Sequence, residues 1–177
     1  MLSFLEMGLG MVKHQAFRKG EAGKKFEVII CSGKGLGESF VNSLNPSDPI
    51  ILMLGTKPYP GTLFVQLKRP INLKGFPYPT NNSEGVKILL GSLESKAVVI
   101  KWTKRYPRNL QLISNFYLRS DLKLVDGQYA EILIASGDIL NNSPEIYWLS
   151  LLQWAKTTRL ADFRRKFIRK FKGNHKI

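Results

Sequence analysis

Three glycines lie close together near the start of the chain, and their spacing suits phosphate binding. Gly33, Gly35 and Gly37 fall within five residues and follow the apolar segment Phe26–Cys31. Because glycine has no Cβ, the backbone N–H groups of such a loop can converge on one anion. The segment matches neither the P-loop pattern nor the Rossmann fingerprint. A phosphate-binding loop and a glycine-rich turn without a ligand therefore both stay open.

Other residue types that commonly carry chemistry are scarce. Cys31 is the single cysteine, and the two histidines, His14 and His175, sit near the two ends of the sequence. These counts exclude a disulfide framework and a multi-cysteine metal site, and they disfavour a Ser-His-Asp or Cys-His catalytic site. No run of 18 apolar residues occurs, and the first residues do not have the pattern of a signal peptide. We therefore expect a cytoplasmic protein.

Positive charge is concentrated toward the end of the chain. The formal net charge is +14, from 27 Lys and Arg against 13 Asp and Glu. Residues 156–177 hold nine basic residues and one acidic residue, Asp162. In the rest of the chain the densest basic and aromatic cluster is KWTKRYPR (Lys101–Arg108). Together with aromatic residues that look exposed, this cluster would suit a nucleic-acid surface; these residues are Tyr59, Tyr78, Trp102, Tyr106 and Tyr117. The alternative is that Trp102 packs on the core side of its strand while the charges face water.

The elements that must position these residues are mostly short strands. Seven segments are rich in β-branched residues, and several alternate apolar and polar residues. They are Phe26–Gly33, Pro49–Leu54, Thr62–Leu67, Val86–Ser92, Lys96–Trp102, Asn109–Ser114 and Tyr129–Ser136. Turn residues separate them, as in PYPG (Pro58–Gly61) and VDG (Val125–Gly127). Short helices are expected over Glu38–Asn45 and Arg119–Leu124. The pattern predicts a compact, mainly β barrel or sandwich.

A different period begins at Ser143-Pro144-Glu145. Apolar residues then recur every three or four positions, which predicts an amphipathic helix with Pro144 in its first turn. They are Trp148, Leu151, Leu152, Ala155, Leu160, Phe163, Phe167 and Phe171. Basic residues occupy the opposite side, a pattern typical of helices that lie on a membrane surface. Packing on the barrel with a solvated basic end, or contact with nucleic acid, are the alternatives.

Four segments in fixed order resemble the archaeal CTP-dependent riboflavin kinases. They are GLGE (Gly35–Glu38), PYPGTL (Pro58–Leu63), KILLGSLESKAVVIKW (Lys87–Trp102), and Leu118-Arg119 followed by LKLVDGQYAEILI (Leu122–Ile134). The resemblance implies a small cradle-loop β-barrel over residues 26–137. Residues 1–25 would form an N-terminal extension and residues 138–177 the basic amphipathic helix.

The resemblance also implies a nucleotide site for CTP, the phosphate donor. The family's phosphate-binding loop corresponds to Gly35, Leu36, Gly37, Glu38, Ser39 and Phe40, and its second nucleotide-binding stretch corresponds to Phe116, Tyr117, Leu118 and Arg119. Arg119 would contact phosphate through charge-assisted hydrogen bonds. The acceptor hydroxyl would lie beside Thr62, which takes the catalytic position and that of one metal ligand.

The chain departs from the family at three positions. The second ligand of the divalent metal, an Asn in the family, is Phe64 here. The two flavin-side positions, Thr and Glu in the family, become Arg105 and Gln111. Asn72 or Glu38 would be other oxygen ligands for Mg²⁺, and Lys34, Lys68 or Arg105 would be cations able to replace the metal's charge.

Three functional hypotheses follow. The first is a CTP-dependent phosphotransferase whose acceptor is riboflavin or another hydroxyl compound, including one linked to a membrane. In that case the basic helix would hold the protein at the inner membrane surface. The second is a barrel that binds nucleotide without catalysis, which Phe64 favours. The third is a basic β-barrel that binds nucleic acid.

Overall fold

The computed structural model describes residues 22–33, 37–79 and 85–157. In chain order the elements are β1 (Gly23–Cys31), α2 (Gly37–Asn42), α3 (Pro49–Leu54), β2 (Leu63–Leu67), β3 (Asn72–Leu73), β4 (Phe76–Pro77), β5 (Val86–Leu93), β6 (Lys96–Thr103), β7 (Asn109–Ile113), α4 (Leu118–Asp121), β8 (Tyr129–Ala135), the 3₁₀ turn Ser136–Asp138, β9 (Ile139–Leu140) and α5 (Pro144–Thr157). Six of the seven expected strands are present.

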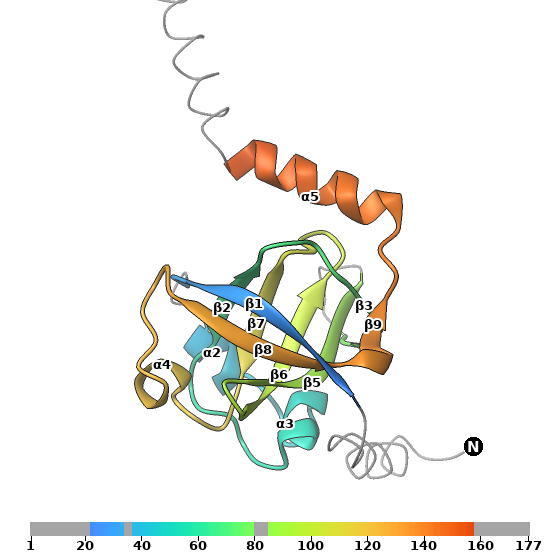
Figure 1. The fold of residues 1–177 in the computed structure, drawn as a ribbon. Helices are drawn as coiled ribbons and strands as arrows, with labels where there is room; N and C mark the ends of the chain where they lie inside the picture. The colour runs from blue at the N-terminus through green and yellow to red at the C-terminus, as the bar shows by residue number, and fades with distance from the viewer. Residues whose placement is uncertain (1–21, 34–36, 80–84, 158–177) are drawn as a thin grey trace, which may run out of the picture.

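Six strands form a closed antiparallel barrel (Figure 1). Around the ring the order is β5-β6-β7-β2-β1-β8, and β8 pairs with β5 to close it. This seam is three residue pairs long and begins at Gly91, opposite Ile134. A Cβ on Gly91 would lie 2.6 Å from Ile100 Cδ1 and 2.8 Å from the Leu133 carbonyl oxygen. Glycine therefore permits the close strand approach at the seam. The prediction of a mainly β barrel is confirmed.

The alternation that predicted the strands also fills the barrel. In β2, Leu63, Val65 and Leu67 are buried, while Phe64 and Gln66 lie on the outer face. The inner side chains of the six strands form one continuous core, to which Trp102 belongs with 1% exposure. Trp102 and Tyr78, expected among the exposed aromatics of a nucleic-acid surface, are both buried. The exposed placement was wrong for both rings: Trp102 packs in the barrel core, which is the alternative that the sequence left open, and Tyr78 packs in a separate apolar cluster outside the barrel.

A second apolar cluster covers the outer face of β5, β6 and β7. Val41 of α2 and Ile50 of α3 pack there against strand residues such as Val99 and Ile113. Pro49–Leu54, predicted as a strand, is the helix α3. The Asp48 carboxylate accepts the Ile50 N–H at 2.8 Å as an N-cap. Pro49 begins the helix, and Gly55 ends it with φ +74°.

The helix α5 lies at the end of the barrel that the β6–β7 turn forms (Figure 1). It begins at Pro144, as predicted, and its described part ends at Thr157. The basic residues 158–177 lie outside the described residues, as do residues 1–21. Within the part of the chain that the structure describes, no helix is long and apolar enough to cross a membrane.

Candidate functional site

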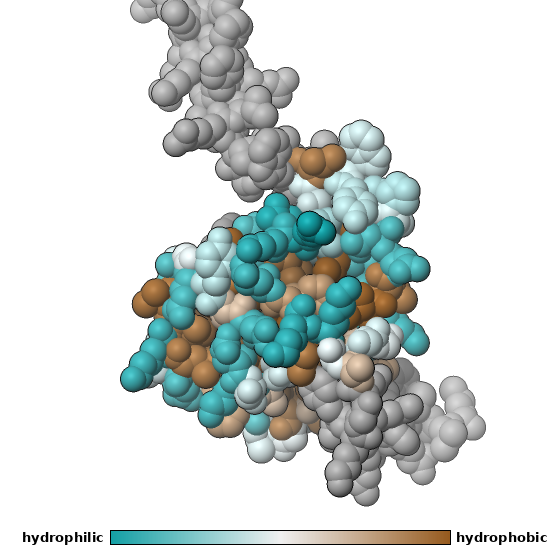
Figure 2. All heavy atoms as spheres, viewed as in Figure 1, coloured by the Kyte–Doolittle hydropathy of each residue, from teal (hydrophilic) through white to brown (hydrophobic). Residues whose placement is uncertain are grey.

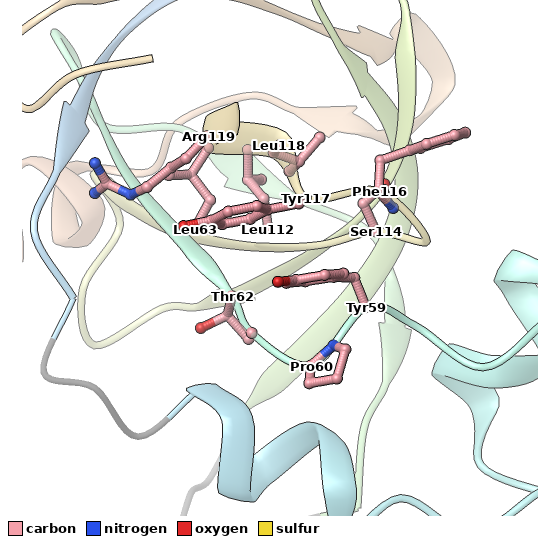
Figure 3. Close-up of a pocket in the computed structure, with 11 residues that line it drawn as sticks. Tyr59, Pro60, Thr62, Leu63, Leu112, Ser114, Phe116, Tyr117, Leu118 and Arg119 are labelled. Atoms are coloured by element: carbon pink, nitrogen blue, oxygen red, sulfur yellow. Dashed lines mark hydrogen bonds between the residues drawn. The ribbon is translucent and has the colours of Figure 1, made fainter. Parts of the chain in front are cut away.

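A pocket of about 170 Å³ opens at the end of the barrel opposite α5. The segment that leads into β2 forms one side, and the segment that follows β7 forms the other (Figure 3). Buried leucines from both segments form the floor. The lining residues are Tyr59, Pro60, Gly61, Thr62, Leu63, Leu112, Ser114, Phe116, Tyr117, Leu118 and Arg119.

Thr62 lines the pocket immediately before the first residue of β2. Its Oγ1 accepts a hydrogen bond from Gln111 Nε2 at 3.1 Å. Gly37, the last glycine of the glycine loop, is packed directly against Thr62. A Cβ on Gly37 would lie 2.5 Å from Thr62 Oγ1 and 2.7 Å from its backbone nitrogen. The end of the glycine loop therefore adjoins the pocket at Thr62.

Two tyrosines stack at the rim of the pocket (Figure 3). The rings of Tyr59 and Tyr117 are nearly parallel, with centroids 4.8 Å apart and an interplanar angle of 10°. Ser114 holds both segments in place. Its carbonyl oxygen accepts the Tyr59 N–H at 2.8 Å, and its Oγ accepts the Phe116 N–H at 3.3 Å. The rim thus offers flat aromatic surface beside an apolar floor.

Arg119 supplies the positive charge of the pocket. Its Nη2 donates to the Cys31 carbonyl oxygen at 2.9 Å and to Asp126 Oδ1 at 2.6 Å. The Asp126 carboxylate also accepts a hydrogen bond from Ser32 Oγ. Hydrogen bonds from Ser32 and Arg119 hold the pKa of Asp126 below its usual value, so this carboxylate is charged at neutral pH. The guanidinium is thereby held between β1 and the pocket.

Comparison with known proteins identifies the family. Residues 30–134, more than half of the chain, match the model of the CTP-dependent riboflavin kinase domain, which is described as a domain of unknown function, DUF120. The chain belongs to this family. It is 32% identical to the riboflavin kinase of Ignicoccus hospitalis over 124 residues, which cover 59% of this chain and 68% of that protein. It is also 32% identical to the riboflavin kinase of Thermococcus kodakarensis over 113 residues, which cover 55% of this chain and 53% of that protein. The chain thus spans about half the length of the second relative.

The family's nucleotide positions come together only in part within the described residues. The stretch Phe116–Arg119 lines the pocket, and Gly37 adjoins it. Glu38 and Ser39 are exposed in the first turn of α2. Phe40 packs against the apolar cluster on the outer face of the barrel and not in the pocket. Its ring centroid lies 4.2 Å from Lys101 Nζ. Gly35 and Leu36 lie outside the described residues.

The two altered flavin-side positions separate in space. Gln111 contacts Thr62, but Arg105 is exposed in the β6–β7 turn, at the α5 end of the barrel. Asn72 lies at that end too, where its amide donates to the Asn141 carbonyl oxygen. Lys68 forms an ion pair with Glu27 there. The structure therefore brings only Gln111 of these residues to the pocket.

The residues around Thr62 do not fit the family's divalent metal. Mg²⁺ prefers oxygen ligands, and the family's second ligand position holds Phe64, whose ring cannot bind it. Thr62 Oγ1 also accepts the Gln111 amide, which leaves it one lone pair. The Phe64 ring packs against Gly33, where a Cβ would lie 3.1 Å from Phe64 Cδ2. Among the described residues, no group of three His, Cys, Asp or Glu side chains is placed to hold a metal.

Sequence reasoning did not single out Ser114, Asp126 or the Tyr59–Tyr117 stack as parts of the site. The sequence placed Tyr59 among the exposed aromatics and in the PYPG segment, and Asp126 in the VDG turn, without assigning either to the nucleotide site. Strand pairing makes both of them site residues, because it brings together segments that are far apart in the sequence. Local pattern carries no signal for such pairing, although both residues lie in segments that carry the family resemblance.

Proposed function

We propose that this chain is a kinase that uses CTP to phosphorylate a hydroxyl group of a small water-soluble acceptor, with riboflavin as the first candidate. One observation supports the proposal: Thr62, at the family's catalytic position, and the stretch 116–119, at its second nucleotide position, line a single pocket with Arg119 at its edge. Family membership supplies the reaction class, and the names of the relatives supply the acceptor.

In this reaction the acceptor oxygen attacks the γ-phosphorus of CTP. The bond from that phosphorus to the β–γ bridging oxygen breaks, CDP leaves, and the proton of the acceptor hydroxyl passes to water. Such transfers depend mainly on positioning and on stabilising the phosphate charge. Arg119 is the group we assign to the phosphates, because its planar guanidinium binds phosphate oxygens in pairs.

Thr62 would act as a hydrogen-bond donor. A hydroxyl has one hydrogen and two lone pairs. Since the Gln111 amide occupies one lone pair of Thr62 Oγ1, the hydroxyl hydrogen is left for a phosphate or acceptor oxygen. Magnesium, if it accompanies CTP, would then be held by the nucleotide's phosphates and not by Thr62 and Phe64.

A second candidate function is nucleotide binding without transfer. The observation that favours it is the loss of the metal-ligand pair, with Phe64 packed on Gly33. Both candidates predict CTP binding, and only the first predicts a phosphorylated product.

The deciding experiment is calorimetric titration with CTP, ATP and GTP, in magnesium and in chelator, followed by a product assay with riboflavin. We expect selective CTP binding, and Arg119→Ala should weaken it by about 10- to 100-fold, the value of a charged hydrogen bond. Arg105→Ala is the matched control, because this exposed arginine lies at the far end of the barrel, and its affinity should equal that of the wild type.

Each outcome has a distinct meaning. Formation of FMN and CDP supports the kinase, and selective CTP binding without product from riboflavin or other soluble acceptors supports the second candidate. Failure to bind any nucleotide, or equal losses in Arg119→Ala and Arg105→Ala, would contradict the assignment of this pocket.

A further inference from the structure

The outward face of α5 is apolar, which is the reverse of what a helix packed on a soluble barrel usually presents. Tyr147, Trp148 and Leu151 are 52%, 67% and 54% exposed. Ile146 and Ser150, on the opposite side of the helix, are buried. We call Tyr147, Trp148 and Leu151 the α5 face. Large side chains gathered in this way on an exposed surface usually mark a site of interaction.

Specific contacts hold α5 with this face turned outward. Ile146 is fully buried and belongs to the core of the barrel. Glu145 Oε2 accepts a hydrogen bond from Lys104 Nζ at 2.5 Å, which ties the first turn of α5 to the β6–β7 turn. Just before the helix, Asn142 Nδ2 donates to the Pro70 carbonyl oxygen at 2.8 Å. The exposure of the α5 face therefore follows from how the helix is anchored.

Positive charge surrounds the α5 face. Arg69, Lys104 and Arg105 are exposed at the same end of the barrel, and Glu145 of α5 is engaged by Lys104. In the sequence that follows α5, residues 158–177 add eight basic residues and one acidic residue. In Figure 2, the described part of α5 carries pale-teal and brown side chains, and strongly teal side chains lie on the barrel below it, with brown ones between them. The helix thus combines apolar contact area with a basic surrounding.

We propose that the α5 face docks on an anionic lipid bilayer. Tyr and Trp favour the boundary between headgroups and acyl chains, and exposed Lys and Arg near the surface gain about 1 kcal/mol each from anionic lipid. A second copy of this chain fits less well, because pairing two α5 faces would bring two basic surroundings together. A nucleic acid would satisfy the charge but leave Leu151 and Trp148 unused.

The docked orientation leaves the pocket accessible. Thr62 and the α5 end of the barrel are separated by the length of β2, about 17 Å at 3.4 Å per residue. The pocket therefore opens away from the bilayer, toward water. This orientation suits a soluble acceptor and does not suit one embedded in the same membrane. The docking proposal itself does not depend on the nucleotide activity.

Sedimentation of the full chain with lipid vesicles tests the proposal. One set of vesicles is phosphatidylcholine alone, and the other contains phosphatidylglycerol as well. We expect binding to the anionic vesicles that weakens as salt rises. The double variant Trp148→Ser/Leu151→Ser should reduce partitioning by at least about tenfold, because it removes the apolar insertion. Val125→Ser is the matched control, since Val125 is 64% exposed in a turn away from α5.

Three results would overturn the proposal. The first is no binding to anionic vesicles at low salt, and the second is equal vesicle binding by the double variant and the wild type. The third is binding to a polynucleotide by a chain that does not bind vesicles. Light scattering tests the remaining candidate, a second copy of this chain. A dimer that forms with the wild type but not with the double variant would assign the α5 face to that second copy. Far-ultraviolet circular dichroism and thermal unfolding of the same variants show that each is folded, whether or not the chain binds CTP.

Discussion

Thr62 is the residue at which three parts of the site meet. Gly37 packs on it from the glycine loop, Gln111 donates to it from β7, and its own segment carries Tyr59 into the pocket rim. None of these contacts lies within one local motif. A change at any of them is therefore expected to act on the pocket through the position of Thr62.

Gly37→Ala tests the packing of the glycine loop. The new Cβ would lie 2.7 Å from the Thr62 backbone nitrogen, so the loop or β2 must shift. We expect CTP affinity to fall by at least about tenfold, which corresponds to a loss of about 1.4 kcal/mol of binding free energy. The measurement is calorimetric titration.

Gly33→Ala is the control within the same loop. Its Cβ would lie 3.1 Å from Phe64 Cδ2 and 3.5 Å from Cε2, and this side chain can move by a few tenths of an ångström. We therefore expect a smaller loss. Equal affinities of the Gly37 variant and the wild type would show that the loop does not depend on its packing against Thr62.

At the level of elements, α3 links the outer apolar cluster to the barrel. Asp48 caps the helix with one carboxylate oxygen and accepts the Tyr78 hydroxyl with the other, at 2.9 Å. Burial and this bond raise the pKa of Tyr78, so the phenol stays protonated. Lys101 lies 5.4 Å from the Tyr78 ring. Burial lowers the pKa of Lys101, and the charge of Asp48 opposes that effect.

Asp48→Ala should therefore destabilise the fold. The lost cap costs about 1 kcal/mol and the lost Tyr78 hydrogen bond about as much again. Tyr78→Phe should show only the second loss. The measurement is urea unfolding at neutral pH, with Asp121→Ala, at an exposed position in α4, expected to stay near the wild type. A stability loss for Asp121→Ala as large as that for Asp48→Ala would contradict this account.

The sequence allowed most strands to be predicted, because the alternation of apolar and polar residues, as in Thr62–Leu67, is typical of a strand with one buried face. Pro49–Leu54 was misjudged because a short apolar run suits a strand and a helix alike. Asp48, Pro49 and Gly55 were the helix signals available. The two-residue strands β3, β4 and β9 are too short to show a period. The Thr62–Gln111 contact needs the register of β2 against β7, which depends on the whole sheet.

At the level of the whole molecule, the barrel separates two surfaces. The pocket lies where β2 begins, and the α5 face lies beyond its end. Changes at one surface should therefore leave the other unaffected, since distant sites with no shared contacts act independently. This separation predicts that nucleotide affinity and vesicle binding can be altered one at a time.

The triple variant Arg164→Gln/Arg165→Gln/Lys166→Gln tests that separation in the full chain. Removing three basic residues should weaken binding to anionic vesicles by about 100-fold, at about 1 kcal/mol per residue. CTP affinity should stay within about twofold of the wild type. A parallel fall in both measurements would show that the basic residues serve the nucleotide site, and an unchanged vesicle affinity would show that they play no part in docking.

The closed ring of strands also has a consequence for synthesis of the chain. β8 is the last barrel strand in the sequence, and it pairs with both β1 and β5. A chain interrupted before Tyr129 would therefore have two unpaired strand edges, one along Gly23–Ile29 of β1 and a short one along Gly91–Leu93 of β5. Open edges of this kind pair readily with other chains. Incomplete products should consequently aggregate, while in the complete barrel β8 covers both of these edges.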